Sequence, residues 1–277
     1  MKKSAIINDL SGIGRCSLNV AIAILATLKI QTCPLPTAIL SNQTGFDEFS
    51  YLDFTPHMKD YYAYWDKLNY EFDSIYSGFL GSKEQVEILV DFIKRFKKKD
   101  TLVLIDPVMG DNGVLYPVYE KTYPIDMRRL VALADVITPN ITELTLLLGV
   151  SLEEVITKED LKDYKEQLKI LGPNKIVVTG IIEKDKMYNV GIDLEKDEWY
   201  EVEVVFNHKS YSGTGDIFAS IICGYLTQGR SLEESICSAT DFISKSITYT
   251  EKQSSWDTRE GIMYEALLKE LSIDETI

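Results

Sequence analysis

A glycine-rich turn before an apolar run has the residue types of an anion-binding site. Gly213 and Gly215 flank Thr214, and the small and apolar residues that follow predict a helix beginning here. Main-chain amides at the start of a helix point outward and bind anions. Asp216, in the first turn, could accept a hydroxyl proton while the amides of the three preceding residues stabilise charge on a transferred phosphoryl group. The same residues could instead form a turn and an aspartate helix cap.

Other polar side chains follow predicted strands at the points where those strands end: Asp9, Asp106, Thr138, Asn140, Glu143 and Thr179. Ligands of open parallel sheets bind beyond the carboxyl ends of the strands, so we expect these residues at one edge, beside the Gly213 turn. Two simpler interpretations stay open. Asp106 could merely end a strand, and Asn140 with Glu143 could be a helix N-cap and its capping partner.

The elements that must position these residues alternate between strand and helix along most of the chain. This pattern predicts an α/β fold with a doubly wound, mostly parallel sheet and helices on both faces. Expected strands or extended segments lie at 5–7, 30–40, 74–77, 101–105, 136–137 and 175–180. Expected helices lie at 18–28, 57–68, 84–97, 127–133, 144–148, 158–171, from 213 onward, 232–248 and 259–271.

Three further features concern the outline of the fold. Prolines 34 and 36 suggest that segment 30–40 lies at the edge of the sheet. Segments 187–194 and 198–205 alternate and are joined by a charged turn, which predicts a small edge hairpin. We found neither linkers nor repeats, so residues 1–277 are expected to form a single domain.

The charge balance argues against two classes of partner. The chain has 43 acidic and 29 basic side chains, a formal net charge of −14. Such a surface repels nucleic acids and anionic membranes, so neither is expected as a partner. Four cysteines without paired spacing and two histidines predict neither disulfides nor a zinc site. Because no apolar run suits a signal peptide or a membrane span, we expect a cytoplasmic protein.

Three motifs, in their order and separation, resemble the ribokinase superfamily. They are Asp-Pro-Val-Met-Gly-Asp at 106–111, Thr-Pro-Asn-Ile-Thr-Glu at 138–143 and Gly-Thr-Gly-Asp at 213–216. Segments 14–17, 41–44 and 77–82 are most similar to the bacterial pyridoxal or pyridoxamine kinases. The resemblance implies ATP-dependent phosphorylation of the 5-hydroxymethyl group of pyridoxal, pyridoxine or pyridoxamine. It also implies Mg2+, in many members K+, and a homodimer.

The resemblance assigns roles to the matched catalytic and metal residues. Asp216 would be the base for the hydroxymethyl proton, and Gly213, Thr214 and Gly215 would form the anion hole. Glu143, together with Asn140, would organise Mg2+ through water, since magnesium keeps much of its hydration shell.

Further matched residues would bind the nucleotide and the vitamer. Asp106 and Asp111 would meet the nucleotide phosphates and their metal, with Thr138 nearby, and Thr179 would contact phosphate oxygens. On the substrate side, Thr44 and Gly45 match contacts to the pyridine ring.

Asp9 departs from the family pattern, because many pyridoxal kinases have serine at this position. An ionised carboxylate can only accept hydrogen bonds and would repel a phenolate-like ring oxygen. We therefore hypothesise that Asp9 accepts from a protonated ring nitrogen or an exocyclic amine. Cys16, near a predicted helix start, raises a separate possibility, since a helix dipole can favour a reactive thiolate.

Two other functions are compatible with the sequence. A hydroxymethylpyrimidine kinase of thiamin synthesis acts on a similar hydroxymethyl heteroaromatic ring, but such relatives commonly have cysteine where this chain has Asp216. A non-catalytic protein that holds a vitamer or a nucleotide is the alternative from another class. It would not need a base beside the glycine cradle.

Overall fold

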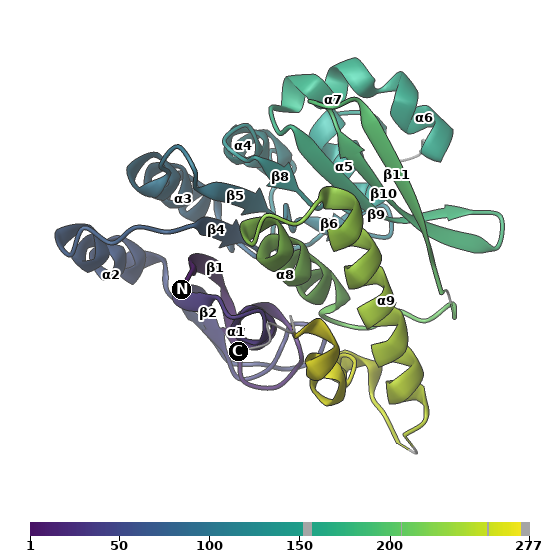
Figure 1. Ribbon diagram of the computed structural model, residues 1–277. Coiled ribbons are helices and arrows are strands. Elements are labelled where there is room, and N and C mark those ends of the chain that lie inside the picture. Colours follow the sequence, from purple (N-terminus) through teal and green to yellow (C-terminus); the bar gives the residue numbers. More distant parts are fainter. Residues whose placement is uncertain (152–156, 206, 254, 273–277) are drawn as a thin grey trace.

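The computed structural model describes residues 1–151, 157–205, 207–253 and 255–272. Its described part contains a nine-stranded sheet with the order β11-β10-β9-β8-β5-β4-β1-β2-β3 (Figure 1). The strands of this sheet are β1 (Lys3–Ser11), β2 (Gln31–Leu40), β3 (Tyr51–Asp53), β4 (Ser74–Ser77), β5 (Leu102–Ile105), β8 (Val136–Ile137), β9 (Lys175–Glu183), β10 (Lys186–Asp193) and β11 (Glu198–Val204).

The interior of this sheet is parallel and both its margins are antiparallel. The interior strands lie in the order β2, β1, β4, β5, β8 and β9, and every neighbouring pair among them is parallel. At one margin β10 and β11 run antiparallel to their neighbours, and at the other margin β3 does. The predicted edge hairpin is therefore confirmed as β10 and β11. A second, two-stranded sheet of β6 (Gly110–Asp111) and β7 (Val114–Leu115) was not expected.

The edge position expected for segment 30–40 is wrong, because β3 pairs with β2 on its outer side. This pairing begins at Ala38, beyond Pro34 and Pro36. The prolines lack an amide hydrogen, and their stretch of β2 has a partner only in β1. The short strand β3, too short to recognise in the sequence, takes the margin of the sheet.

Alternate side chains of the strands enter two separate cores, one on each face of the sheet. In β1, Ala5 and Ile7 belong to the core covered by α2 to α7, and Ile6 belongs to the core covered by α1, α8 and α9. Figure 1 shows these helices on opposite faces of the sheet. The predicted doubly wound α/β fold is confirmed.

The helices follow the predicted segments closely in the first two thirds of the chain. Their bounds are α1 (Ser17–Thr27), α2 (Thr55–Lys67), α3 (Lys83–Phe96), α4 (Tyr123–Val131), α5 (Ile141–Leu148), α6 (Lys158–Asp163), α7 (Lys165–Leu171), α8 (Thr214–Thr227), α9 (Leu232–Glu251), η1 (Thr258–Glu260) and η2 (Tyr264–Leu271). Segment 158–171 is two helices rather than one, and segment 259–271 is largely 3₁₀-helical, with a break at Gly261.

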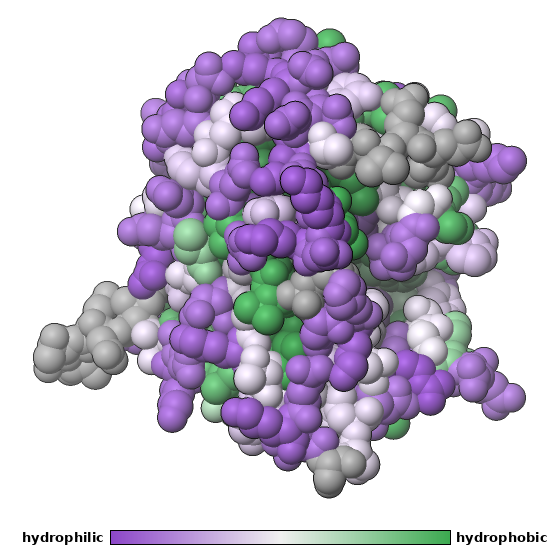
Figure 2. Space-filling view, turned by 90° about the vertical axis from the view of Figure 1, so that its right-hand side faces the viewer, coloured by the Kyte–Doolittle hydropathy of each residue, from purple (hydrophilic) through white to green (hydrophobic). Residues whose placement is uncertain are grey.

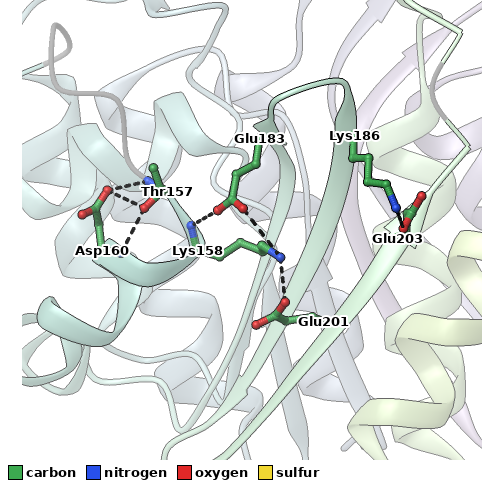
Figure 3. Close-up of polar contacts among 7 residues, drawn as sticks. All are labelled: Thr157, Lys158, Asp160, Glu183, Lys186, Glu201 and Glu203. Carbon is green, nitrogen blue, oxygen red and sulfur yellow. Dashed lines mark hydrogen bonds and ion pairs between the residues drawn. The ribbon is translucent and has the colours of Figure 1, made fainter.

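Helix α6 is attached to the antiparallel margin of the sheet at its first turn (Figure 3). The Thr157 hydroxyl accepts from the main-chain NH of Asp160 as its N-cap. The Lys158 ammonium lies 2.7 Å from Glu201 of β11 and 3.7 Å from Glu183 of β9. The margin is thus cross-linked to the helical layer by a chain of ion pairs, although exposed pairs of this kind contribute little stability individually.

Charged and polar side chains dominate the face that carries the antiparallel margin and α9 (Figure 2). On this face, hydrophobic residues are visible mainly in the gaps between polar side chains, near the middle of the view. Within the described residues, we found no helix with the length and apolar composition that crossing a membrane requires.

An aromatic cluster between α2 and α3 gives a direct test of the packing. Phe92 is fully buried and packs against the rings of Tyr62, Trp65 and Phe96. We expect Phe92→Ala to lower the free energy of unfolding by about 3–5 kcal/mol, through lost burial and the cavity that remains. Urea denaturation measures this change. The matched control is Tyr64→Ala, whose side chain is 64% exposed, and an equal loss in both proteins would contradict the packing.

Candidate active site

The first turn of α8 presents free main-chain amides, as the glycine-rich turn predicted. Gly213 is the N-cap, and its carbonyl accepts from the NH of Ile217 (3.0 Å). The amides of residues 214–216 have no acceptor within the helix, so the free set lies one position beyond the predicted 213–215, and no side chain of the described residues caps it. Gly215 is exposed, and a β-carbon added there would meet no atom from outside the helix within 4 Å. The helix start can therefore receive an anion.

Gly213 is required by a close approach of two chain segments. It has φ +77°, and a β-carbon there would lie 1.9 Å from the carbonyl oxygen of Arg15. Arg15 belongs to the loop between β1 and α1. The start of α8 is thereby packed directly onto the loop that follows β1, which brings Asp216 next to the end of that strand.

Asn8 connects Asp216 to the sheet. Its Nδ2 donates to Oδ1 of Asp216 (3.1 Å), and its Oδ1 accepts from the main-chain NH groups of Asp9 (3.0 Å) and Phe79 (2.9 Å). A β-carbon at Gly78 would lie 2.3 Å from Nδ2 of Asn8, so only glycine leaves room for this side chain. Sequence reasoning chose the neighbouring Asp9 and missed Asn8. The signal available was an amide side chain beside Asp9 in the apolar segment that forms β1.

Asp216 has the electrostatics of a base that works near neutral pH. Its carboxyl group is partly buried, and burial, the largest effect, raises its pKa from 3.8 to about 6. The main-chain amide of Ser17 opposes this rise, the negative charge of Asp9 adds to it, and Asn8 opposes it. A carboxylate of this kind is ionised at pH 7 yet more basic than an exposed aspartate.

Asp106 and Glu143 form a second, deeper pair of carboxyl groups after β5 and at the start of α5. Asp106 accepts from the hydroxyl of Thr138 (3.1 Å). Burial raises the pKa of both acids, and the charge of Asp216 adds to the rise for Asp106, as that of Asp106 does for Glu143. Three negative groups thus lie close enough to oppose each other's ionisation, which a bound cation would relieve.

The capping interpretation of Asn140 and Glu143 is correct as a description of their hydrogen bonds. Asn140 Oδ1 accepts from the NH of Glu143 (2.9 Å), and Glu143 Oε2 accepts from the NH of Asn140 (2.9 Å). Glu143 Oε1 accepts from the NH of Met109 (3.2 Å), and Asn140 Nδ2 donates to the carbonyl of Gly110 (2.9 Å). The cap locks Glu143 in place beside Asp106.

The donor set fits magnesium bound largely through water. Among the residues described, no three histidine, cysteine, aspartate or glutamate side chains converge to hold a metal directly. Two buried carboxyl groups, Asp106 and Glu143, repel each other and have lone pairs left for water or a metal. Mg2+ typically binds one or two carboxylates, several waters and substrate phosphates, so this pair suits it.

The remaining predicted nucleotide residues lie along the same edge. Thr179 donates its main-chain NH to the carbonyl of Pro139 (3.0 Å) and forms a parallel bridge with Asn140. Asp111 is exposed on β6, close enough for its charge to act on Glu143. The tertiary structure therefore brings Asp106, Thr138, Asn140, Glu143 and Thr179 together, with Asp111 at the rim.

The predicted ring contacts, Thr44 and Gly45, lie on an exposed loop whose shape depends on Gln43. The Gln43 side chain accepts from the NH of Gly45 (2.6 Å) and donates to the carbonyl of Arg259 (2.9 Å). Its main-chain NH donates to the carbonyl of Ile13 (3.0 Å). The loop therefore lies beside the segment after β1, and sequence reasoning missed the glutamine that holds it there.

Tyr116, after β7, is a second residue that the sequence analysis missed. The pKa of its phenol is raised, chiefly by burial. The charges of Glu143, Asp111, Asp106 and Asp216 add to this rise. Its side chain is 37% exposed, so Tyr116 lies at the rim of the site, where its hydroxyl can donate to a bound anion. No motif marks it, because its position depends on the unexpected β6–β7 hairpin.

The structure does not favour the reactive thiolate that the sequence left possible at Cys16. The thiol is buried, and burial raises its pKa to about 12, with the charges of Asp216 and Asp9 adding to the rise. Desolvation and two neighbouring carboxylates outweigh the helix dipole, so the thiolate is disfavoured.

Comparison with known proteins agrees with this geometry. The family model described as phosphomethylpyrimidine kinase matches residues 27–259. A crystal structure from Bacteroides thetaiotaomicron, assigned as a phosphomethylpyrimidine kinase and in a crystal form with pyridoxal, has 42% identity and a TM-score of 0.94. It covers 100% of this chain and 97% of its own.

Two curated relatives differ in the substrate that their names give. The pyridoxine kinase of Bacillus subtilis is 31% identical over 180 residues, 63% of this chain and 64% of that protein, which is just under two thirds of its length. The hydroxymethylpyrimidine/phosphomethylpyrimidine kinase of Aquifex aeolicus is 27% identical over 176 residues, 63% of this chain and 67% of that protein.

These names support the expected enzyme class, a kinase with an alcohol group as acceptor, and the fold is consistent with the ribokinase superfamily. With a family model that matches residues 27–259, the chain belongs to the phosphomethylpyrimidine kinase family.

Proposed function

We propose that this protein transfers the terminal phosphate of ATP to the 5-hydroxymethyl group of pyridoxal, pyridoxine or pyridoxamine. The observation that carries the proposal is the position of Asp216. Its carboxyl group, with a pKa of about 6, lies in the first turn of α8, beside free main-chain amides and the Asp106–Glu143 pair. A base, an anion site and a cation site at one edge are what phosphoryl transfer to an alcohol requires.

The proposed reaction assigns one step to each group. Asn8 and the main-chain amide of Ser17 donate to the Asp216 carboxylate and fix it, and this carboxylate would accept the hydroxymethyl proton. The alcohol oxygen forms a bond to the terminal phosphorus of ATP as the bond between that phosphorus and the bridging oxygen breaks. The amides of residues 214–216 stabilise the negative charge on the transferred phosphoryl group.

Asp106 and Glu143 would hold Mg2+ through water, and Mg2+ would neutralise charge on the nucleotide phosphates. Thr138, Asn140 and Thr179 lie beside this pair and would contact phosphate oxygens. The requirement for K+ stays a prediction from family resemblance, as do the homodimer and the cytoplasmic location.

The choice of a vitamin B6 substrate is supported by the pyridoxal in the relative's crystal form and by the relative named pyridoxine kinase. The family description and the relative from Aquifex aeolicus favour hydroxymethylpyrimidine as the second candidate substrate. A protein that only holds a vitamer would have no use for a base beside an anion site, so we consider that function less consistent with Asp216.

The proposal is tested by ATP consumption with each vitamer and with hydroxymethylpyrimidine. We expect turnover of the vitamers, and we expect Asp216→Asn to lower kcat by about 10²-fold or more while ATP binding persists, because the amide keeps the shape but cannot accept the proton. Asp100→Asn is the matched control, since Asp100 is exposed before β5, at the opposite edge of the sheet.

Each contrary result has a definite meaning. Folded protein that turns over none of the four compounds with Mg2+ present would indicate a binding protein. Turnover of hydroxymethylpyrimidine alone would indicate the thiamin function. Near-normal kcat in Asp216→Asn would show that another group accepts the proton.

The pH dependence of catalysis follows from the pKa of Asp216. Only the ionised carboxylate accepts a proton, and its pKa is raised from 3.8 to about 6. With pyridoxine as substrate, kcat/KM should be constant above about pH 7 and fall about tenfold per unit below about pH 5. The residual activity of Asp216→Asn is the control, because ionisation of the nucleotide persists in it. A wild-type profile that stays flat down to about pH 4 would contradict the assignment.

A further inference from the structure

Asp9 is a buried carboxyl group held only by neutral donors. It is 7% exposed, and its Oδ2 accepts from the hydroxyl of Ser11 (2.8 Å). The hydroxyl of Ser17 and the main-chain NH of Asp9 itself also stabilise its charged form. These bonds do not offset burial, which raises the pKa of this carboxyl group. Burying a carboxylate without a cation is costly, so the site favours a ligand that supplies positive charge.

No cationic side chain fills that role among the described residues. Neither Asp9 nor Asp216 takes part in an ion pair there, although arginines lie on the adjoining loops. Arg15 pairs with Glu265 (2.6 Å) and Arg259 pairs with Asp257 (2.8 Å). Both guanidinium groups are thus engaged away from the two carboxylates.

Ser17 places Asp9 directly beside the proposed base. Its hydroxyl donates a hydrogen bond to Asp9, and its main-chain amide donates one to Asp216. Ser17 has φ +53°, a left-handed conformation at the first position of α1 that few residues other than glycine adopt. A ring that offers its hydroxymethyl group to Asp216 therefore presents the neighbouring ring substituent to the region of Asp9.

We propose that Asp9 selects ring substrates that carry a cationic amine on the substituent next to the hydroxymethyl-bearing carbon. The inference rests on the proposed function and specifies its substrate class. Pyridoxamine has this chemistry, because its aminomethyl group is cationic at neutral pH, whereas the ring amine of hydroxymethylpyrimidine is a neutral donor. Pyridoxine and pyridoxal have a hydroxymethyl group and an aldehyde at this place, so neither offers Asp9 an amine.

The experiment measures kcat/KM for all four compounds in wild type, Asp9→Asn, Asp9→Ser and the control Asp100→Asn. We expect wild type to prefer pyridoxamine over pyridoxine, pyridoxal and hydroxymethylpyrimidine by about 10-fold or more. Asp9→Asn should lower kcat/KM for pyridoxamine by about 30-fold, chiefly through KM, because a buried partner of the amine loses its charge. Pyridoxine should change by less than about threefold, since it makes no charge pair with Asp9.

The arms also identify which amine is recognised. Preference for pyridoxamine supports the proposal, because only its amine brings positive charge to Asp9. Preference for hydroxymethylpyrimidine, whose amine is a neutral N–H donor, would overturn it. Equal kcat/KM for pyridoxamine, hydroxymethylpyrimidine and pyridoxine in wild type would overturn it. So would an equal loss for all substrates in Asp9→Asn. Asp9→Ser repeats the loss of charge with a smaller side chain if the asparagine protein does not fold.

The two levels of proposal fail separately. Turnover of pyridoxine that depends on Asp216, without preference for pyridoxamine, leaves the kinase function standing and rejects the role of Asp9. If no compound is turned over, the kinase function fails, and calorimetric titration then tests Asp9 by itself. Binding of pyridoxamine that exceeds pyridoxine binding and is lost in Asp9→Asn would still support the proposal, and equal binding would reject it.

Discussion

The candidate site depends on one close contact, between the start of α8 and the loop that follows β1. A β-carbon at Gly213 would lie 1.9 Å from the carbonyl oxygen of Arg15, so no other residue allows this approach. The contact aims the free amides of α8 at the same space as the carboxyl ends of the strands. It also brings Asp216 within hydrogen-bonding distance of Asn8 on β1. A base, an anion site and the sheet edge thereby converge without a long or flexible connection.

The second constraint is electrostatic. Asp9, Asp106, Glu143 and Asp216 all have raised pKa values, and burial is the largest cause in each case. Such an arrangement opposes folding, because burying like charges without cations is unfavourable. It suits a site whose ligands bring cations. Mg2+ would lie by the deeper pair, Asp106 and Glu143, and a cationic amine would lie by Asp9. Each cation would relieve the repulsion between buried carboxylates, and this relief would contribute to its binding free energy.

Rigid local structures support these groups. The Asn140–Glu143 capping box uses both residues in hydrogen bonds that also fix where the glutamate lies, so its structural and functional interpretations are compatible. Gln43 has the same double character, since it shapes the loop of Thr44 and Gly45 and joins it to the segment around Arg259. Residues at the site are thereby held by bonds to main chain, whose positions the sheet determines.

The sequence by itself determined the fold class, the Gly-Thr-Gly-Asp helix start and the gathering of polar residues toward one edge of the sheet. These depend on local periodicity and on short motifs, which are legible in one dimension. Asp9 and Thr179 lie within β1 and β9, whereas the sequence had predicted them at the ends of those strands. Only the tertiary structure revealed Asn8 and Tyr116, the outer position of β3 and the inert state of Cys16. Each of these depends on segments distant in the chain. Asn8 is explained by the contact of α8 with β1, and Tyr116 by the position of the β6–β7 hairpin near α5. The margin is explained by the pairing of β3 with β2, and Cys16 by the charges of Asp9 and Asp216 near its thiol. Desolvation and charge repulsion are properties of such three-dimensional neighbourhoods, and residue spacing along the chain does not encode them.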